Sequence, residues 1–96
     1  MPEDHVFQIM GRRVPWRYTK LRGTADGWAT IPDARQPDAK SRVLINERLR
    51  GRARLETEIH EFLHCAYPTH SEEHVTAAAR DLARMLHALQ YRRQEQ

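Results

Sequence analysis

The sequence predicts an α+β fold in which a small, mainly antiparallel sheet of about three strands packs on two helices. The first observation is that residues 1–46 alternate short β-favouring runs with turn residues. The second is that residues 47–91 repeat apolar side chains at helical spacing. The third is the length of 96 residues, which suits one small domain spanning residues 1–96.

The strand signals begin near the N-terminus. A run over residues 6–10 predicts a short strand that ends at Gly11. A clearer strand follows, because apolar and polar residues alternate with a period of two, the apolar members being Val14, Trp16 and Tyr18. Pro15 has no backbone N–H to donate, so we expect this strand to lie at a sheet edge there. Trp16 and Trp28 are expected in the core or on a sheet face.

The segment 23–27 is rich in turn residues, and its Asp-Gly pair favours the positive φ angles of tight hairpins. Residues 28–31 would then form the returning strand. Residues 32–40 contain two prolines and several charged side chains, which predicts a surface loop. Residues 42–46 are a short β-favouring run that predicts another strand.

Two helices follow. The first is predicted from one apolar stripe and is ended by Pro68, the stripe being Leu55, Ile59, Phe62, Leu63 and Ala66. Ser71 suits the N-cap of the second helix, with Glu72 and Glu73 in its favourable first turn. We expect that helix to run to about Tyr91, with a long apolar face made of Val75, Ala78, Ala79, Leu82, Met85, Leu86 and Leu89.

The first helix carries the pattern H-E-x-x-H at residues 60–64. On an α-helix, His60 and His64 project from the same face about one turn apart, so both imidazoles can bind one zinc ion. Glu61 projects beside them and could take a proton from the attacking water without being a ligand. At about 100° per residue, both histidines fall on the flank of the apolar stripe, where core and cleft would meet. The alternative is two surface histidines beside a solvated glutamate.

A catalytic zinc ion also needs a third protein ligand and one open position. The candidates downstream are His70, Glu72, Glu73 and His74. Helix phase favours Glu72, which leans toward the inner face, and Glu73 is the alternative ligand. Either glutamate could instead act only through the helix dipole.

Three further side chains lie beside the proposed ligands. Tyr67, His70 or His74 could donate a hydrogen bond to the oxyanion of a tetrahedral intermediate or contact substrate, although each also suits an ordinary loop or surface position. Cys65 is turned away from His64 and is expected to be a small buried residue.

Residues 59–64, followed by Pro68 and by residues 71–75, resemble the gluzincin group of the zincin metallopeptidases. The chain is similar to the minigluzincins and to small phage or bacterial H-E-x-x-H proteins. The resemblance implies a minimal zincin-like fold that binds one Zn²⁺ per chain through His60, His64 and a glutamate of the following helix. It also implies Glu61 as general base, a peptide or protein substrate, and a strand that pairs with an extended peptide. Residues 42–46 or 28–31 could be that strand.

Composition narrows the other possibilities. The formal charge of +3 permits contact with nucleic acid without requiring it, so a small DNA-binding helical module is a less favoured alternative. A zinc-stabilised interaction domain without turnover is another. A single cysteine suggests a reducing compartment, and no leader or membrane-spanning run is visible. We therefore expect a cytoplasmic protein of a bacterium, or of a host cell if phage-encoded, with its oligomeric state left open.

Overall fold

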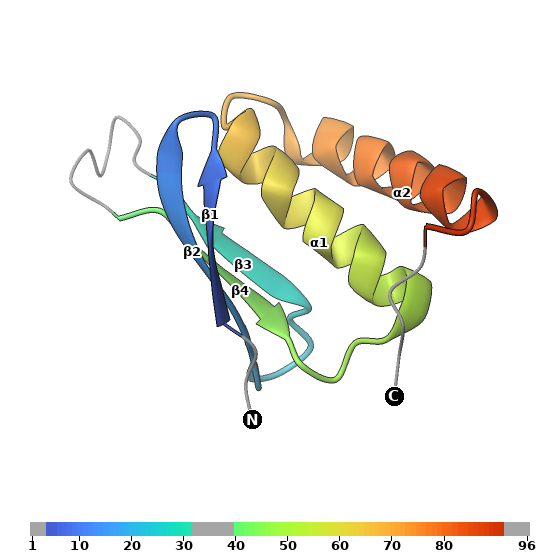
Figure 1. Ribbon diagram of the computed structural model, residues 1–96, viewed down its shortest axis with the longest axis horizontal. Helices are drawn as coiled ribbons and strands as arrows, with labels where there is room; N and C mark the ends of the chain where they lie inside the picture. The colour runs from blue at the N-terminus through green and yellow to red at the C-terminus, as the bar shows by residue number, and fades with distance from the viewer. Residues whose placement is uncertain (1–3, 32–39, 92–96) are drawn as a thin grey trace.

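The computed structural model describes residues 4–31 and 40–91. Its elements in chain order are β1 (Asp4–Ile9), β2 (Arg12–Thr19), β3 (Gly27–Thr30), β4 (Arg42–Asn46), α1 (Gly51–Ala66) and α2 (Glu72–Ala88). Both helices lie on the same side of the sheet, where α1 packs on the strands and α2 packs on α1 (Figure 1). The predicted α+β class is confirmed. No helix among the described residues is long and apolar enough to cross a membrane.

Over residues 4–31 and 40–91 the sheet is mixed and contains four strands in the order β1-β2-β4-β3. β1 pairs antiparallel with β2, β3 pairs antiparallel with β4, and β2 and β4 are parallel. The prediction of about three mainly antiparallel strands is therefore wrong. Val43 and Ile45 of β4 are both 0% exposed, which suits a central strand that has neighbours on both edges.

The predicted strand end at Gly11 and the predicted turn over residues 23–27 have different outcomes. Met10 and Gly11 join β1 to β2 with φ angles of 50° and 79°, the pattern of a two-residue type I′ hairpin. The strand that ends before Gly11 is thus confirmed. Gly27 instead opens β3, and β3 pairs with β4 rather than returning along β2. The predicted loop over residues 32–40 lies outside the described residues except for Lys40.

β2 is an interior strand between β1 and β4, so the expectation of an edge strand is wrong for β2 as a whole but holds locally at Pro15, which pairs only with β1. Pro15 is paired in register with Val6 of β1, whereas pairing with β4 begins only at Trp16. The proline therefore lies just outside the β2–β4 ladder, where its missing N–H leaves no hydrogen bond unmade on that side.

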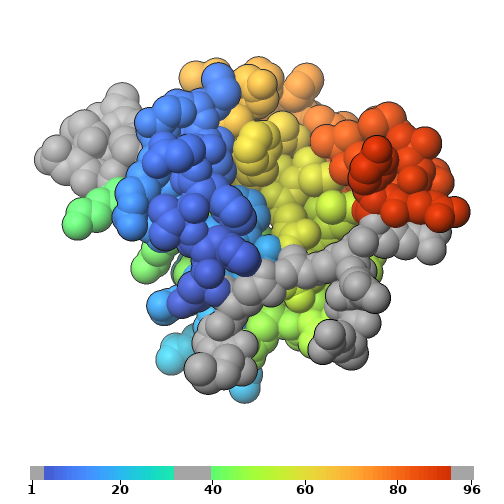
Figure 2. Space-filling view, in the orientation of Figure 1, coloured from blue at the N-terminus to red at the C-terminus, as the bar shows by residue number. Residues whose placement is uncertain are grey.

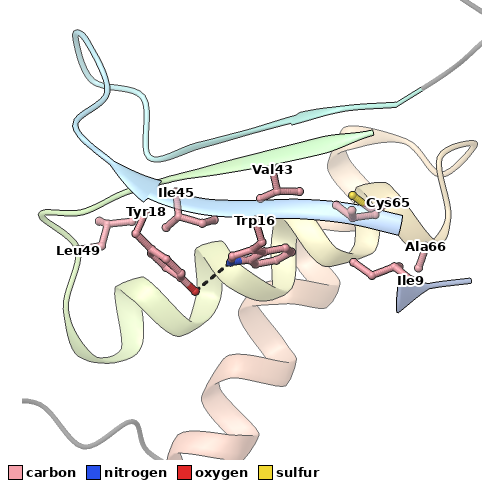
Figure 3. Packing of buried hydrophobic residues seen from close by; sticks show 9 residues of the cluster. Ile9, Trp16, Tyr18, Val43, Ile45, Leu49, Cys65 and Ala66 are labelled. Carbon is pink, nitrogen blue, oxygen red and sulfur yellow. Dashed lines mark hydrogen bonds between the residues drawn. The ribbon is translucent and has the colours of Figure 1, made fainter. Parts of the chain in front are cut away.

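The core lies between the sheet and α1 (Figure 3). The predicted alternation in β2 is confirmed, since Val14, Trp16 and Tyr18 are all buried. The Trp16 indole N–H donates to the Tyr18 hydroxyl at 2.9 Å. That hydroxyl donates in turn to Glu58 of α1, so the two polar atoms that these aromatic rings bring into the core are both satisfied. Trp28 lies on a sheet face and is 55% exposed.

The sheet-facing side of α1 differs from the predicted apolar stripe. The buried residues of α1 are Arg54, Glu61, Cys65 and Ala66, and of these only Ala66 belongs to the predicted stripe. Ile59 and Leu63 lie about half a turn around the helix from Glu61 and Cys65, and α2 packs on α1. Phe62 lies between these two sides and is 42% exposed, so its predicted place in the core is wrong. In the space-filling view, α1 (yellow) is visible between β1 (blue) and α2 (orange to red) (Figure 2).

Local signals at the helix ends are largely confirmed. α1 ends at Ala66, two residues before Pro68. The backbone N–H of His74 donates to the Ser71 hydroxyl at 3.1 Å, so Ser71 is the N-cap of α2. α2 ends at Ala88 rather than near Tyr91, and Gln90 follows in the left-handed region with φ of 68°. Its apolar face is only partly covered, because Leu82, Met85 and Leu89 are exposed.

Candidate metal centre

Three side chains from the two helices converge on one point. The Nε2 atoms of His60 and His64 lie 3.1 Å apart. Glu72 Oε1 lies 2.9 Å from His60 Nε2, and Glu72 Oε2 lies 2.9 Å from His64 Nε2. Both imidazoles are about one-fifth exposed, whereas the Glu72 side chain is 67% exposed. The ligand atoms therefore face a cleft that solvent can enter.

The turn between the helices brings Glu72 to the histidines. α1 ends at Ala66, two residues after His64, and residues 67–71 reverse the chain. The Ser71 cap then starts α2, which makes Glu72 its first residue. Glu73 is one position further around the helix and does not join the cluster. Of the two glutamates considered, the structure thus places Glu72 beside the histidines.

The donor set suits a metal ion. The Nε2 atoms of His60 and His64 lie 3.1 Å apart, and each also faces one oxygen of Glu72. One cation can accept lone pairs from both rings and from the carboxylate. Among the described residues the cluster has no fourth histidine, cysteine or carboxylate ligand. It can therefore hold a metal ion and leave a position open.

Glu61 lies next to this cluster on the sheet-facing side of α1 and is only 6% exposed. Burial, and secondarily the negative charge of Glu72, raise the pKa of Glu61 from 4.5 to about 7. Within the described part of the chain, no hydrogen bond or ion pair holds its carboxylate. A buried carboxylate with a raised pKa and no hydrogen-bond donor can accept a proton at neutral pH.

Two cavities meet at Glu61. The larger, about 380 Å³, is lined by Gly27, Trp28, Ala29 and Ile31 on the sheet side and by His60, Glu61, His64 and Glu72 on the helices. The smaller, about 240 Å³, is lined by Asp26, Gly27, Glu56, Thr57, His60 and Glu61. Gly27, His60 and Glu61 line both, so the candidate site lies where the two cavities join.

Gly27 is a site residue, although its sequence context predicts only a turn. A Cβ atom at this position would lie 2.9 Å from Glu61 Oε2 and 3.0 Å from Thr57 Cγ2. Glycine therefore lets β3 approach α1 without displacing the Glu61 side chain. The signal available in the sequence was a glycine at the start of a strand, which often marks close backbone approach.

β3 is also the edge strand next to the cluster, because the sheet order is β1-β2-β4-β3. Its outer edge has no partner strand among the described residues. β4 is paired on both edges. Of the two segments proposed to pair with a peptide, residues 42–46 are therefore excluded. Residues 28–31, most of which lie in β3, keep an available edge.

The other side chains considered near the site lie apart from it. Tyr67, His70 and His74 are exposed and contact one another. Tyr67 stacks on His70 with ring centroids 5.2 Å apart, and His70 meets His74 edge-on with centroids 4.8 Å apart. None of the three lines either cavity beside Glu61. Cys65 is 1% exposed, as expected, and burial raises its thiol pKa to about 11. A thiol with so high a pKa is a poor nucleophile at neutral pH, and Cys65 is not part of the His60, His64 and Glu72 cluster.

Comparison with known proteins adds no assignment. No family model matches the chain, and neither the curated proteins nor the solved structures include a significant match to it. Its chemistry is therefore inferred from the arrangement of His60, Glu61, His64 and Glu72.

Proposed function

We propose that this protein is a zinc-dependent metallopeptidase that hydrolyses peptide bonds, with one Zn²⁺ per chain and Glu61 as the general base. The observation that supports the proposal is the convergence of His60, His64 and Glu72 next to the buried Glu61 carboxylate. Two imidazoles and one carboxylate with an open fourth position are a ligand set typical of catalytic zinc.

The three donor groups are close enough to share one ion. The two imidazole Nε2 atoms lie 3.1 Å apart, and each of the two Glu72 oxygens lies 2.9 Å from one of them. With one ligand atom taken from each residue, all three atoms lie within 4.8 Å of one another. The nitrogen ligands favour zinc over magnesium and calcium, which prefer oxygen ligands throughout.

The chain's own groups account for the remaining chemistry. Zinc supplies a Lewis acid that polarises the substrate carbonyl and makes water more acidic. Glu61 takes the proton from the attacking water and delivers it to the leaving amine. Its position beside two ligands, with its carboxylate facing both cavities, is what these proton transfers need.

The edge of β3 supports a peptide as the substrate. An extended peptide can form backbone hydrogen bonds with an open strand edge, which holds it without reading its side chains. β3 lines the larger cavity through Gly27, Trp28 and Ala29. A peptide paired with β3 would therefore run along both cavities and pass Glu61 between them.

Zinc content and peptide hydrolysis test the proposal together. Purified protein is expected to bind one zinc ion per chain and to cleave members of a mixed peptide library. Glu61→Gln should keep the zinc and lose hydrolysis, whereas His60→Ala should lose both. Glu47→Gln is the matched control, since Glu47 is exposed and lines neither cavity.

Three results would overturn the proposal. Undiminished hydrolysis by Glu61→Gln would exclude Glu61 as the base. Bound zinc without cleavage of any peptide would favour a zinc-stabilised interaction domain. Salt-sensitive DNA binding by the metal-free protein, without hydrolysis, would favour a DNA-binding module.

A further inference from the structure

The two cavities that meet at Glu61 differ in charge. The smaller one has carboxylates on opposite walls, Asp26 at the end of the segment leading into β3 and Glu56 on α1. No lysine or arginine lines it among the described residues. The larger cavity has apolar side chains beyond the metal cluster, namely Trp28, Ala29 and Ile31.

The two carboxylates are not equally compensated. Asp26 forms an ion pair with Arg48 at 2.7 Å, and both side chains are more than half exposed. Glu56 is half-buried and forms no ion pair with any residue that the structure describes. The cavity wall formed by α1 therefore presents a negative charge that a positively charged ligand group could neutralise.

A second observation connects this cavity to a ligand. Glu61 is 94% buried, has no hydrogen-bond partner among the described residues and has its carboxylate in the same cavity. The cavity is thus continuous with the position where the reacting bond of a substrate would lie. A side chain next to that bond would enter it.

We infer that the cavity between Asp26 and Glu56 is a specificity subsite for a lysine or arginine side chain of a peptide substrate, adjacent to the scissile bond. This inference rests on the proposed peptidase function and names its substrate class. Glu56 would contact the cationic head group, while Thr57 and Gly27 would line the path of its aliphatic stem. The opposite cavity would accept an apolar residue.

Matched peptides test the preference in the zinc-loaded protein. Each test uses two peptides that differ at one position, where one has lysine and the other norleucine. The pair compares a charged side chain with an uncharged one of similar length, and the position is set first on one side of the scissile bond and then on the other. At low salt we expect kcat/KM for the lysine peptide to exceed that for the norleucine peptide by about tenfold at one of these positions, the effect of one partly screened ion pair. Glu56→Gln should bring the lysine-to-norleucine ratio of kcat/KM close to one. Glu56→Lys should instead favour a peptide with glutamate at this position over the lysine peptide. Glu47→Gln should keep the wild-type ratio.

A binding measurement separates this inference from the peptidase proposal. Peptide hydroxamates with lysine or norleucine at the preferred position bind zinc without being cleaved, so calorimetry can compare their affinities. A lysine advantage that Glu56→Gln removes supports the subsite even if no peptide is hydrolysed. Equal affinities, or equal kcat/KM values at both positions, would overturn the subsite and leave the peptidase proposal standing. Failure of both hydroxamates to bind would overturn the subsite together with the zinc site.

Discussion

Glu61→Gln should stabilise the metal-free protein at alkaline pH, because the native Glu61 carboxyl is held in a buried position. Its pKa is 4.5 in the unfolded chain and about 7 in the folded protein. Between these values the folded state binds more protons than the unfolded state, so the free energy of unfolding falls as pH rises. The stabilisation associated with the protonated carboxyl is complete below pH 4.5 and is lost as pH rises through 7.

The size of the effect follows from the two pKa values. One pKa unit corresponds to about 1.4 kcal/mol, so moving from pH 5 to pH 8 should cost the wild type about 2–3 kcal/mol through Glu61 alone. A domain of this size has a total stability of about 5–15 kcal/mol. The effect is therefore a large fraction of the total and is measurable by urea denaturation.

The assay compares unfolding of chelator-treated wild type and Glu61→Gln at pH 5 and pH 8. We expect the variant to gain about 2–3 kcal/mol relative to wild type over this interval. Taking the difference between proteins cancels the other titrating groups that both share. Glu47→Gln, which replaces an exposed carboxylate, should follow the wild type. A variant that gains nothing, or that loses stability relative to wild type as pH rises, would refute the proposed cost of ionising Glu61.

Three further predictions follow from the packing around the site. Glu72→Ala should weaken zinc binding at least tenfold in a chelator competition, because one of three protein ligands is lost, whereas Glu73→Ala should leave it within about twofold. Similar losses for the two variants would contradict the placement of Glu72. Gly27→Ala should cost about 1–3 kcal/mol in denaturant unfolding and reduce hydrolysis, because its Cβ would lie 2.9 Å from Glu61 Oε2. Unchanged stability and activity would show that β3 is not held this close to α1. Ile45→Ala should cost about 2–5 kcal/mol, since Ile45 is 0% exposed in the central strand, and a loss below 1 kcal/mol would argue against that position.

Several features follow from short-range patterns and were predicted correctly for that reason. The alternation of Val14, Trp16 and Tyr18 depends only on the two-residue period of a strand. The joint projection of His60 and His64 depends only on the pitch of an α-helix. The start of α2 depends on Ser71, whose hydroxyl accepts a hydrogen bond from within the next turn.

The strand order could not be predicted in this way. β4 inserts between β2 and β3 because its two inner residues, Val43 and Ile45, become buried against α1 and against neighbours on both sides. No local pattern specifies which strands pair across a long connection. This pairing nevertheless determines the site, because it makes β3 the edge strand and brings Gly27 against Glu61.

The H-E-x-x-H segment likewise combines features set by the local sequence with features set by long-range packing. The sequence by itself determined which residues share a helix face and that Glu61 lies beside two potential ligands. Only the tertiary structure decided that Glu61 faces the sheet while Phe62 stays 42% exposed, because α1 packs on the strands with one side and on α2 with the other. An apolar stripe in the sequence indicates a single buried side of a helix. The pKa of Glu61 depends instead on desolvation by strands that are far away in the sequence. Local geometry thus positions the metal ligands, and long-range packing sets the chemistry of the base beside them.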